Sequence, residues 1–466
     1  MGCTQSSPTS PELASVPQSK KEAKFAKDTN GMAKCSSCSG VFVDTLGANN
    51  EMELRQKKSV HISSSTKQNW YPTKTKPNQD SCVAYRFKAP DGTSVHFIAV
   101  LDGHGDDGHK ISQFVAQNLP QMVERKCLQI VPDGPTMDRG DIEKACFDAH
   151  AACQEILLKK TDIELLWSGT TCCSILIWTG GITVCNVGDS RVVMGELVTS
   201  TTQDPGGDEK VLFAAKALSR DHIPLRKDER DRVKKSGCRV ITIGQAVGQQ
   251  EIDEDANEHM WTVSERVNEK EGDERIYTVD PPRIFVADGS YPGYQFTRAF
   301  GDLAGQRMGA LIAEPEISTI RFLSTTGLIV LATDGVFEYL TDQDVIDVAS
   351  LFKFPLDACE AVTEIAYKNW RDKDVRTDDI TITCIHCNRE DLDPMALSMS
   401  VRNGTRMVNE PPHEKQSGLP NFRNLTADAI KGYIRSGQLG MQQVRAGLRS
   451  NESFLFGESD LMDIKN

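Results

Sequence analysis

The sequence contains no long apolar run and no excess of positive charge. Without about 18 consecutive apolar residues, no segment is long enough to span a bilayer. The 53 Lys and Arg residues are outnumbered by 66 Asp and Glu residues, which gives a net charge of -13. This balance argues against general nucleic-acid binding, because that function requires a basic face. Hydrophobic residues make up only 39% of the chain, which indicates polar segments outside a well-built core.

A secretory signal peptide is also missing near the start of the sequence. The chain nevertheless contains 14 cysteines, several of them inside apolar stretches, such as Cys172-Cys173, Cys185, Cys384 and Cys387. Buried thiols in an intracellular protein stay reduced and behave as small hydrophobic side chains. We therefore expect free cysteines in the core of an intracellular protein.

The first residues carry an acylation pattern. Once Met1 is removed, Gly2 followed by Ser6 fits the N-myristoylation motif, and the adjacent Cys3 is a candidate for palmitoylation. A single acyl chain holds a protein on a membrane only marginally, so the second chain matters. We expect a protein tethered to the cytoplasmic face of a plasma membrane or endomembrane, with a fraction in the cytoplasm. The alternative is a chance match in a disordered start.

Composition and periodicity divide the chain into three parts. Residues 1–66 are polar and aperiodic, which predicts a disordered, acylated N-terminal segment. Residues 67–388 form the predicted folded domain, with surface insertions near 199–211 and 245–275. Residues 389–466 are polar with weak amphipathic segments, which predicts a partly helical C-terminal extension.

Alternating strand and helix patterns predict the fold of the middle part. Apolar residues at helical spacing predict helices near 108–125, 140–160, 341–352 and 356–370. Short apolar runs bounded by turns predict strands near 81–87, 97–101, 171–178, 182–187, 328–333 and 380–387. Tight turns between consecutive strands favour antiparallel pairing. We expect a mixed α/β (α+β) fold of four layers, an antiparallel β-sandwich of two sheets flanked by helices on both faces.

Four aspartates each adjoin the end of a predicted core strand: Asp80, Asp102, Asp334 and Asp378. If they converge at one edge of the sandwich, they repel one another unless cations bind. All-oxygen ligation selects hard ions such as Mg²⁺ or Mn²⁺, and two such ions can activate a water for attack on phosphorus. The simpler interpretation of 97–105 alone is a strand that ends in an Asp-Gly turn.

A series of motifs between about 70 and 388 resembles that of the type 2C metal-dependent Ser/Thr protein phosphatases. All of them occur in the order of that family. The motifs are Asn78-Gln79-Asp80, Asp102-Gly103-His104-Gly105, Ser168-Gly169-Thr170-Thr171, Gly188-Asp189-Ser190-Arg191, Ser219-Arg220-Asp221-His222, Thr297-Arg298-Ala299-Phe300-Gly301-Asp302, Glu314-Pro315-Glu316, Thr333-Asp334-Gly335 and Asp378-Asp379-Ile380-Thr381.

The resemblance implies a binuclear metal centre. By position, Asp102 would bridge two Mg²⁺ or Mn²⁺ ions and the Gly103 carbonyl would ligate one of them. Asp334 and Asp378 would ligate the other ion. Asp80 would hold metal-bound or attacking water.

The resemblance also implies an acid and a third ion. His104 would be the general acid for the leaving alkoxide. Asp189 and Glu338, together with Asp334, resemble the ligands of a third, weaker metal. The expected partners are phosphoprotein substrates and, through acylation, a membrane surface; nucleic acid is not expected, and the chain is expected to be a monomer.

Several positions depart from the family pattern. Gln79 and Asp379 stand where Glu and Asn are usual, and Glu338 stands where Asp is usual. We expect Gln79 to hydrogen-bond a metal-bound water. No phosphate-binding arginine is evident upstream of Asp80, and Lys74 or Lys76 would substitute as a point charge.

Other residues of the motifs suit a structural role. Arg191 and Arg298 are expected to be ion-pair partners, and Asp221-His222 is expected to brace a loop. Two alternatives to a protein phosphatase remain open: a pseudophosphatase scaffold, and a metal-dependent phosphatase acting on phosphotyrosine or on small phosphoesters. A scaffold should lose metal carboxylates, whereas Asp102, Asp334 and Asp378 are all present.

Overall fold

The computed structural model describes the folded domain and parts of the preceding segment. The described residues are 32–35, 42–46, 58–72, 75–130, 138–201, 209–261, 280–287, 292–323, 325–352 and 354–387. The acylation candidates Gly2 and Cys3, the lysine Lys74 and the C-terminal extension 389–466 lie outside them. Among the helices of these ranges, none is both long and apolar enough to cross a membrane.

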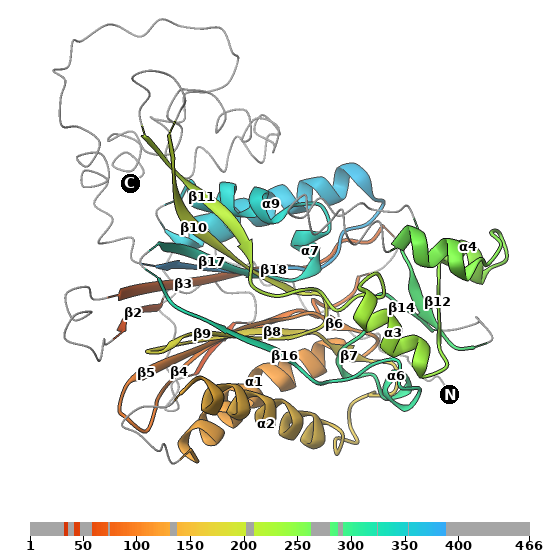
Figure 1. The fold of residues 1–466 in the computed structure, drawn as a ribbon, viewed down its shortest axis with the longest axis horizontal. Coiled ribbons are helices and arrows are strands. Elements are labelled where there is room, and N and C mark those ends of the chain that lie inside the picture. Colours follow the sequence, from red (N-terminus) through yellow and green to blue (C-terminus); the bar gives the residue numbers. More distant parts are fainter. Residues whose placement is uncertain are drawn as a thin grey trace, which may run out of the picture.

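Two six-stranded sheets form the centre of the molecule (Figure 1). The strands of the first sheet, in order, are β1 (Met32–Cys35), β4 (Ser81–Lys88), β5 (Ser94–Leu101), β8 (Cys172–Trp178), β9 (Gly181–Val187) and β16 (Glu316–Ile320). The strands of the second are β11 (Glu209–Ala217), β10 (Arg191–Thr201), β17 (Thr326–Ala332), β18 (Ile380–Cys387), β3 (Lys58–Lys67) and β2 (Phe42–Leu46). Neighbouring strands in both sheets run antiparallel, which confirms the predicted pairing.

Alternation along the strands builds one core between the sheets and one core outside each of them. In β5, Ile98 and Val100 pack in a cluster that includes Ile329 and Leu331 of β17 in the opposite sheet. The intervening side chains of β5 face α1 (Gly108–Leu128) and α2 (Arg139–Leu157). This is the period of two that a strand buried on both faces requires.

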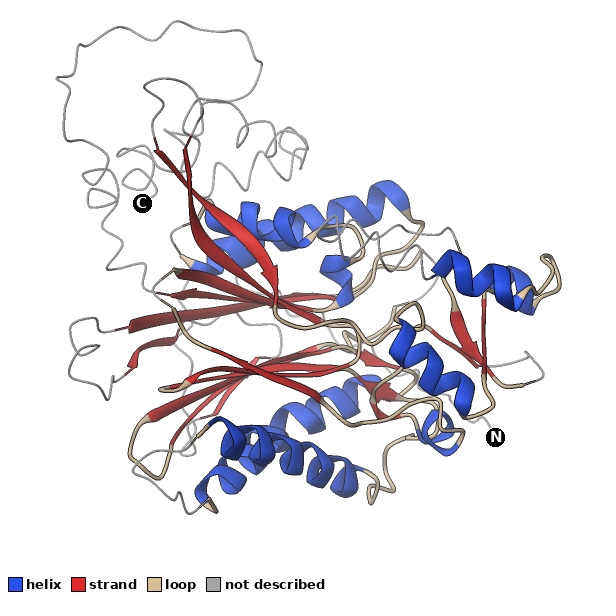
Figure 2. Cartoon of the chain, viewed as in Figure 1, coloured by secondary structure: helices blue, strands red, loops and turns tan. Residues whose placement is uncertain are grey.

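The second sheet is covered in the same way by α7 (Asp334–Phe337), α8 (Asp342–Ser350) and α9 (Pro355–Lys373). Figure 2 shows helices on the outer side of each sheet. The start of α8 is set by the predicted capping box, in which Thr341 and Asp344 each accept a hydrogen bond from the other's backbone N–H at 3.1 Å.

A smaller unit lies at one end of the sandwich (Figure 1). Its three-stranded sheet, which we call the side sheet, consists of β12 (Arg239–Ile241), β13 (Arg283–Phe285) and β14 (Pro292–Tyr294). The helices α3 (Lys227–Lys235) and α4 (Ile243–Ala246) belong to the same region. A further three-stranded sheet joins β6 (Gly103–His104), β7 (Gly169–Thr170) and β15 (Phe300–Gly301), which is followed by α6 (Leu303–Arg307).

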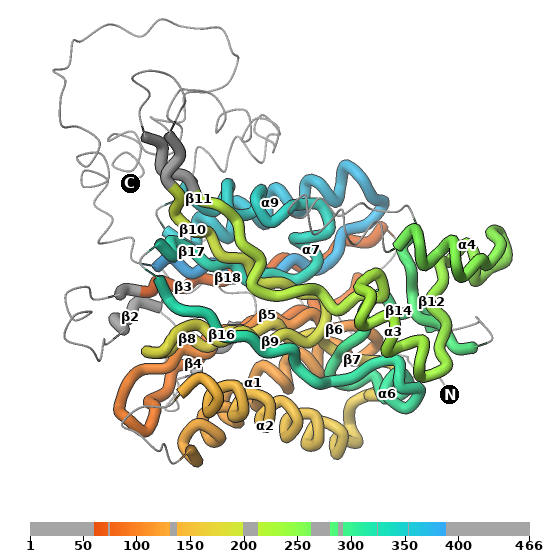
Figure 3. Tube along the Cα trace, in the orientation of Figure 1, coloured from red at the N-terminus to blue at the C-terminus, as the bar shows by residue number. Residues whose placement is uncertain are grey.

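The expected boundary of the N-terminal segment is wrong. Strand β3 begins at Lys58 and pairs with β18 inside the second sheet (Figure 3), and Val60 and Ile62 are buried in the core. Its serines and threonines suggested a linker, but two of them pair with β18: the Ser64 and Thr383 hydroxyls are 2.8 Å apart, and the Thr66 and Thr381 hydroxyls are 2.7 Å apart. Strands β1 and β2 also fall within residues 1–66.

Parts of the two predicted insertions belong to described strands and to a helix. In the first, residues 199–201 of β10 pair with residues 209–211 of β11. In the second, residues 254–261 are helical and Trp261 is 1% exposed, packed with Val233 and Ile284. The polar sequence concealed this anchor because the helix has only two large apolar side chains, Trp261 and the exposed Met260.

The cysteine prediction is confirmed for the part of the chain in which side chains are described. Cys172, Cys173, Cys185, Cys384 and Cys387 are all buried thiols that form no disulfide. Burial raises the pKa of the Cys173 thiol and, less strongly, of Cys153, the latter to about 12. These thiols therefore act as apolar packing groups.

Candidate active site

The four strand-end aspartates come together at one edge of the sandwich. Ser81 pairs with Leu101 in the first sheet, so Asp80 and Asp102 lie at the same end of β4 and β5. Ala332 pairs with Ile382 in the second sheet, which brings Asp334 and Asp378 to the same end of β17 and β18. The antiparallel register therefore places both pairs on neighbouring strand ends.

Direct contacts tie the two sheets together at this edge. The Thr333 hydroxyl donates to Asp80 Oδ2 at 3.0 Å and accepts from the Thr381 N–H at 3.1 Å. The Asp102 and Asp334 carboxyl groups approach within hydrogen-bonding range of each other. Thr333 belongs to the Thr333-Asp334-Gly335 motif, but nothing in the sequence indicated that it links Asp80 to β18.

The electrostatics of the cluster are those of carboxylates without enough counter-charge. Burial, followed by the Asp379 carboxylate, raises the pKa of Asp80 well above its usual value. Burial and then Asp334 do the same to the pKa of Asp102. Burial and then Asp189 do the same to the pKa of Asp334. Each group thus resists ionisation unless a cation is added.

The residues present fit hard divalent cations. Asp80 Oδ1 and Asp334 Oδ1 are buried and have no hydrogen-bond partner among the described residues. Within these same ranges, no three His, Cys, Asp or Glu side chains form a ready-made cage for a metal ion. An open, oxygen-only set suits Mg²⁺ or Mn²⁺, because Mg²⁺ in particular keeps several of its own water ligands.

The turn after Asp102 depends on glycine. A Cβ added to Gly103 would overlap the Gln79 carbonyl oxygen and would lie 2.5 Å from the Gly108 carbonyl oxygen. Gly105 has a φ of +82°, a conformation that other residues rarely adopt. Both glycines thus allow the chain to turn tightly at the start of α1.

His104 is held by a partner that the sequence did not single out. Its Nε2 lies 2.6 Å from Asp302 Oδ2, and the Asp302 side chain is fully buried. Gly169 makes room for this pair, since a Cβ there would overlap Asp302 Oδ2 and would lie 2.7 Å from His104 Nε2. Asp302 itself has a φ of 47°, which is unusual for a residue other than glycine.

Gln79 makes a contact that the sequence did not predict. Its side-chain Nε2 donates to the Gly105 carbonyl at 2.7 Å, so the amide braces the glycine turn. Asp379 also has a structural role, because it accepts hydrogen bonds from the Asn69 and Gln79 N–H groups at 2.8 and 2.9 Å and from the Asn69 side chain at 2.8 Å. Burial raises the pKa of Asp379 despite these donors.

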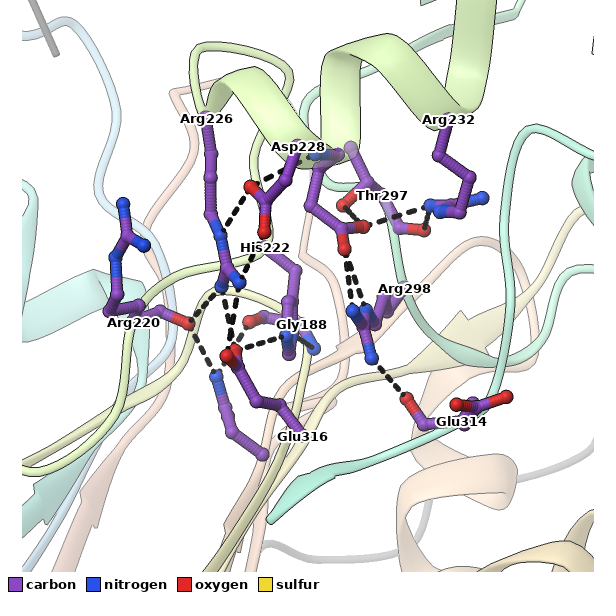
Figure 4. A network of polar contacts seen from close by, with 12 residues as sticks. Gly188, Arg220, His222, Arg226, Asp228, Arg232, Thr297, Arg298, Glu314 and Glu316 are labelled. Carbon is purple, nitrogen blue, oxygen red and sulfur yellow. Dashed lines mark hydrogen bonds and ion pairs between the residues drawn. The ribbon is translucent and has the colours of Figure 1, made fainter. Parts of the chain in front are cut away.

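The proposed third-metal residues lie beside the cluster. Both Asp189 and Glu338 act electrostatically on Asp334. Just before Asp189, the Gly188 N–H donates to His222 Nδ1 at 3.1 Å, and His222 Nε2 lies 3.1 Å from Glu316 Oε2. Figure 4 shows this buried histidine between the turn and the Glu316 carboxylate. The prediction that Asp221-His222 braces a loop is therefore confirmed.

A network of arginines surrounds that brace (Figure 4). Arg226 donates to both oxygens of Glu316, at 2.7 and 3.0 Å, and pairs with Asp228 at 2.8 Å. Arg298 pairs with Glu229 at 2.5 Å. The bidentate pairs of Arg226 and the pair of Arg298 with Glu229 fix α3 against β16 and against the turn that precedes β15.

The expectation of structural arginines is confirmed for both residues. Arg298 makes the pair with Glu229 described above, and its Nη1 donates to the Glu314 carbonyl at 2.9 Å. Arg191 is buried and pairs with Asp221 at 2.8 Å and with Asp342 at 2.7 Å. Of the predicted phosphate-binding lysines, Lys76 lies with its Nζ 5.2 Å from the centre of the Tyr71 ring.

Comparisons with known proteins agree with the motif series. The family model described as Protein phosphatase 2C matches residues 73–369. Probable protein phosphatase 2C 35 of Arabidopsis thaliana is 32% identical over 381 residues, which cover 77% of this chain and 99% of that protein. Probable protein phosphatase 2C 72 of the same plant is 27% identical, with 66% and 81% covered.

Among solved structures, the serine-threonine phosphatase 2C from Toxoplasma gondii aligns with a TM-score of 0.49 at 18% identity, over 75% of this chain and all of that one. The family match alone spans more than half of the sequence, and its range contains Asp80, Asp102, His104 and Asp334. The chain therefore belongs to the protein phosphatase 2C family of metal-dependent Ser/Thr phosphatases, and it is a hydrolase.

Proposed function

We propose that the chain hydrolyses phosphoserine and phosphothreonine in phosphoproteins with two Mg²⁺ or Mn²⁺ ions bound at the aspartate cluster. One observation carries this proposal: buried carboxylates from both sheets meet at one edge, and two of them retain unpaired oxygens. Asp102, the Gly103 carbonyl, Asp334 and Asp378 would hold the two ions.

When bound, such ions polarise the phosphoryl group and lower the pKa of a water that attacks phosphorus in line. The protein's own contribution is orientation. Asp80 is fixed by the Thr333 hydroxyl through Oδ2, which leaves Oδ1 to accept a hydrogen bond from the attacking water. Asp189 and Glu338 lie beside Asp334, where they would support a third, weaker ion.

His104 supplies the proton for the leaving alkoxide in this proposal. The Asp302 carboxylate at Nε2 orients the ring, so Nδ1 is the nitrogen that is left to face the leaving group. The Phe296 ring lies 4.4 Å from the imidazole centre, tilted by 39°, and limits the rotation of the imidazole.

The N-terminal pattern completes the proposal. Acyl chains on Gly2 and Cys3 would attach the enzyme to a cytoplasmic membrane face, while the phosphatase domain acts as a monomer. A pseudophosphatase scaffold is the competing function, and it is disfavoured because none of the cluster aspartates is replaced. Action on phosphotyrosine or small phosphoesters is the other alternative.

The proposal is tested by phosphopeptide hydrolysis with Mn²⁺, with Mg²⁺ and with a chelator, for the wild type and Asp102→Asn. We expect metal-dependent release of phosphate from phosphoserine and phosphothreonine peptides, and a loss of at least about 10³-fold in the variant. Circular dichroism of the variant controls for folding. Unchanged turnover in a folded Asp102→Asn protein would refute the binuclear proposal, and faster turnover of a phosphotyrosine peptide would favour the alternative substrate.

A further inference from the structure

The loop that joins α2 to β7 exposes two large apolar side chains in succession. Leu166 is 38% exposed and Trp167 is 37% exposed, whereas the preceding Leu165 is buried in the core outside the first sheet. Isolated exposed apolar residues are common on protein surfaces, but adjacent ones beside a candidate active site indicate a contact surface. We call residues 164–168 the tryptophan loop.

Sheet register places the tryptophan loop beside His104. The loop leads into β7, which pairs with β6 so that Gly169 lies opposite His104. A Cβ added to Gly105 would lie 2.5 Å from the Trp167 carbonyl oxygen, so the backbone of the loop packs against the glycine turn. Two residues of chain span at most about 7 Å, so Trp167 is no farther than this from Gly169. The two exposed side chains therefore belong to the rim around His104.

Hydrogen bonds fix the tryptophan loop to its neighbours. Glu164 Oε1 accepts hydrogen bonds from the Leu166 and Trp167 N–H groups at 2.8 and 3.1 Å. Its Oε2 accepts from the Ser168 hydroxyl at 2.6 Å, and its N–H donates to Asp107 Oδ2 at 2.8 Å. The loop also accepts two backbone hydrogen bonds from the start of α6, at 2.9 and 3.0 Å. Because the loop is held before a ligand arrives, binding to it costs less conformational entropy.

A phosphopeptide substrate has to pass this rim, because His104 must reach the leaving oxygen of the phosphorylated residue. Consecutive Cα atoms are 3.8 Å apart, so residues one or two positions away lie within about 8 Å of the phosphorylated residue. The tryptophan loop lies at a comparable distance from His104. The Phe296 ring also borders His104, with 4.4 Å between the ring centres, so apolar side chains approach the acid from two segments of the chain.

We propose that Leu166 and Trp167 bind an apolar residue that flanks the phosphorylated residue of the substrate. This inference rests on the proposed phosphatase function and deepens it, since it names a preferred class of substrate: phosphoproteins with a bulky aliphatic side chain within two residues of the phosphoserine or phosphothreonine. Contact between apolar side chains is favourable because it removes apolar surface from water. Tryptophan is also among the residues most enriched at the positions that dominate binding energy in protein interfaces.

Two phosphoserine peptides test this proposal. They differ only in the two residues on each side of the phosphoserine, which are leucine in one peptide and alanine in the other. Values of kcat/KM are measured for both with the Mn²⁺-loaded full chain. We expect the wild type to prefer the leucine peptide by about 10-fold, the range of one apolar side chain removed from water.

The ratio of the two kcat/KM values separates docking from catalysis, because a general loss of turnover lowers both values equally. Trp167→Ala should remove most of the preference for the leucine peptide. Trp167→Phe keeps an aromatic ring and should recover most of it. Phe147→Ala is the matched control, since Phe147 is similarly exposed, at 42%, but lies on α2 and not in the loop, and its ratio should equal that of the wild type.

The proposal is overturned if the wild type hydrolyses both peptides equally well, which would leave the phosphatase function standing. It is also overturned if Trp167→Ala keeps the full preference, or if Phe147→Ala loses it to the same extent. A change of molecular mass for Trp167→Ala in sedimentation would overturn it as well, because the surface would then join copies of the chain. If neither peptide is hydrolysed but a fluorescent leucine peptide binds the wild type more tightly than Trp167→Ala, the phosphatase proposal fails while the docking surface stands.

Discussion

The aspartate cluster and the arginine network next to it contain similar carboxylates in opposite electrostatic conditions. In the cluster, burial and neighbouring carboxylates raise the pKa of Asp80, Asp102 and Asp334. In the network, burial acts in the same direction, but hydrogen bonds from Arg298 and Thr297 overcome it and lower the pKa of Glu229 to about 2. The neighbouring charged and polar groups, and not the depth of burial, therefore decide whether the pKa of a buried carboxyl group rises or falls.

The two histidines repeat this contrast. His222 is fully buried, and burial lowers its pKa even though Nε2 contacts Glu316. His104 has a 24% exposed side chain while its carboxylate partner Asp302 is fully buried. The first ring is enclosed as a brace, whereas the second is partly exposed. The carboxylates of the network find positive partners within the fold, whereas those of the cluster lie beside other carboxylates.

Replacing one carboxylate by an amide in each region should give the largest difference in stability between the network and the cluster. Glu229→Gln leaves Arg298 without its counter-charge in a buried site, so we expect a loss of about 3–5 kcal/mol in the free energy of unfolding. Asp102→Asn removes a repelling charge, so in chelator its stability should equal or exceed that of the wild type. Denaturant unfolding measures both.

Asp228→Asn is the control for the network. The Asp228 side chain is 58% exposed and Arg226 keeps its pair with Glu316, so the loss should stay below about 1 kcal/mol. Equal losses in Glu229→Gln and Asp228→Asn, or a severe destabilisation of Asp102→Asn without metal, would mean that the two regions do not differ as described.

The pH dependence of stability should separate the regions. Glu229 has a folded pKa of about 2 against about 4.5 unfolded, so its contribution of about 3 kcal/mol is present above pH 4.5 and is lost as pH falls towards 2. The cluster aspartates have raised folded pKa values, so the metal-free protein should lose stability as pH rises from about 4 through those values.

Mn²⁺ should abolish only the loss of stability that the cluster aspartates cause. Because bound cations favour the ionised aspartates, stability should no longer fall as pH rises, whereas the loss of stability at low pH that depends on Glu229 should stay unchanged. Thermal unfolding across pH, with Mn²⁺ and with chelator, measures this. The assignment of the two regions would be contradicted if Mn²⁺ shifted the loss of stability at low pH, or if stability still fell with rising pH in the presence of Mn²⁺.

Proton donation by His104 can be tested with substrates whose leaving groups differ in their need for a proton. His104→Ala should slow hydrolysis of a phosphoserine peptide by about 10²-fold, because the alkoxide needs a proton, and should slow hydrolysis of an aryl phosphate much less. Values of kcat for both substrates give the comparison. Equal losses would assign His104 a structural role like that of His222.

The smallest expected effect concerns Asp379. It lies next to the cluster residue Asp378, but its carboxylate accepts hydrogen bonds from Asn69 and Gln79. Asp379→Asn restores the residue usual in the family but loses the acceptor for one of its three N–H donors. We expect a loss of about 1 kcal/mol in stability and little change in kcat. A large fall in kcat with unchanged stability would place Asp379 in the catalytic machinery.

Much of the fold was predictable because local patterns carried it. The predicted strands near 171–178 and 380–387 correspond to β8 and β18, and Thr341 with Asp344 marked the start of α8. The segment that contains β3 was misread, since its polar residues resemble a linker. Only the pairing with β18 satisfies the Ser64 hydroxyl and buries Val60 and Ile62.

The sequence by itself determined the family, through motifs in a fixed order, and identified the aspartates at the strand ends. Tertiary structure decided which groups meet: Thr333 with Asp80, 253 residues apart, and His104 with Asp302, 198 residues apart. It also decided which arginines form buried ion pairs, such as Arg191 with Asp342 and Arg298 with Glu229. Such contacts depend on sheet register and on the packing of distant segments, and local sequence patterns do not encode either of them.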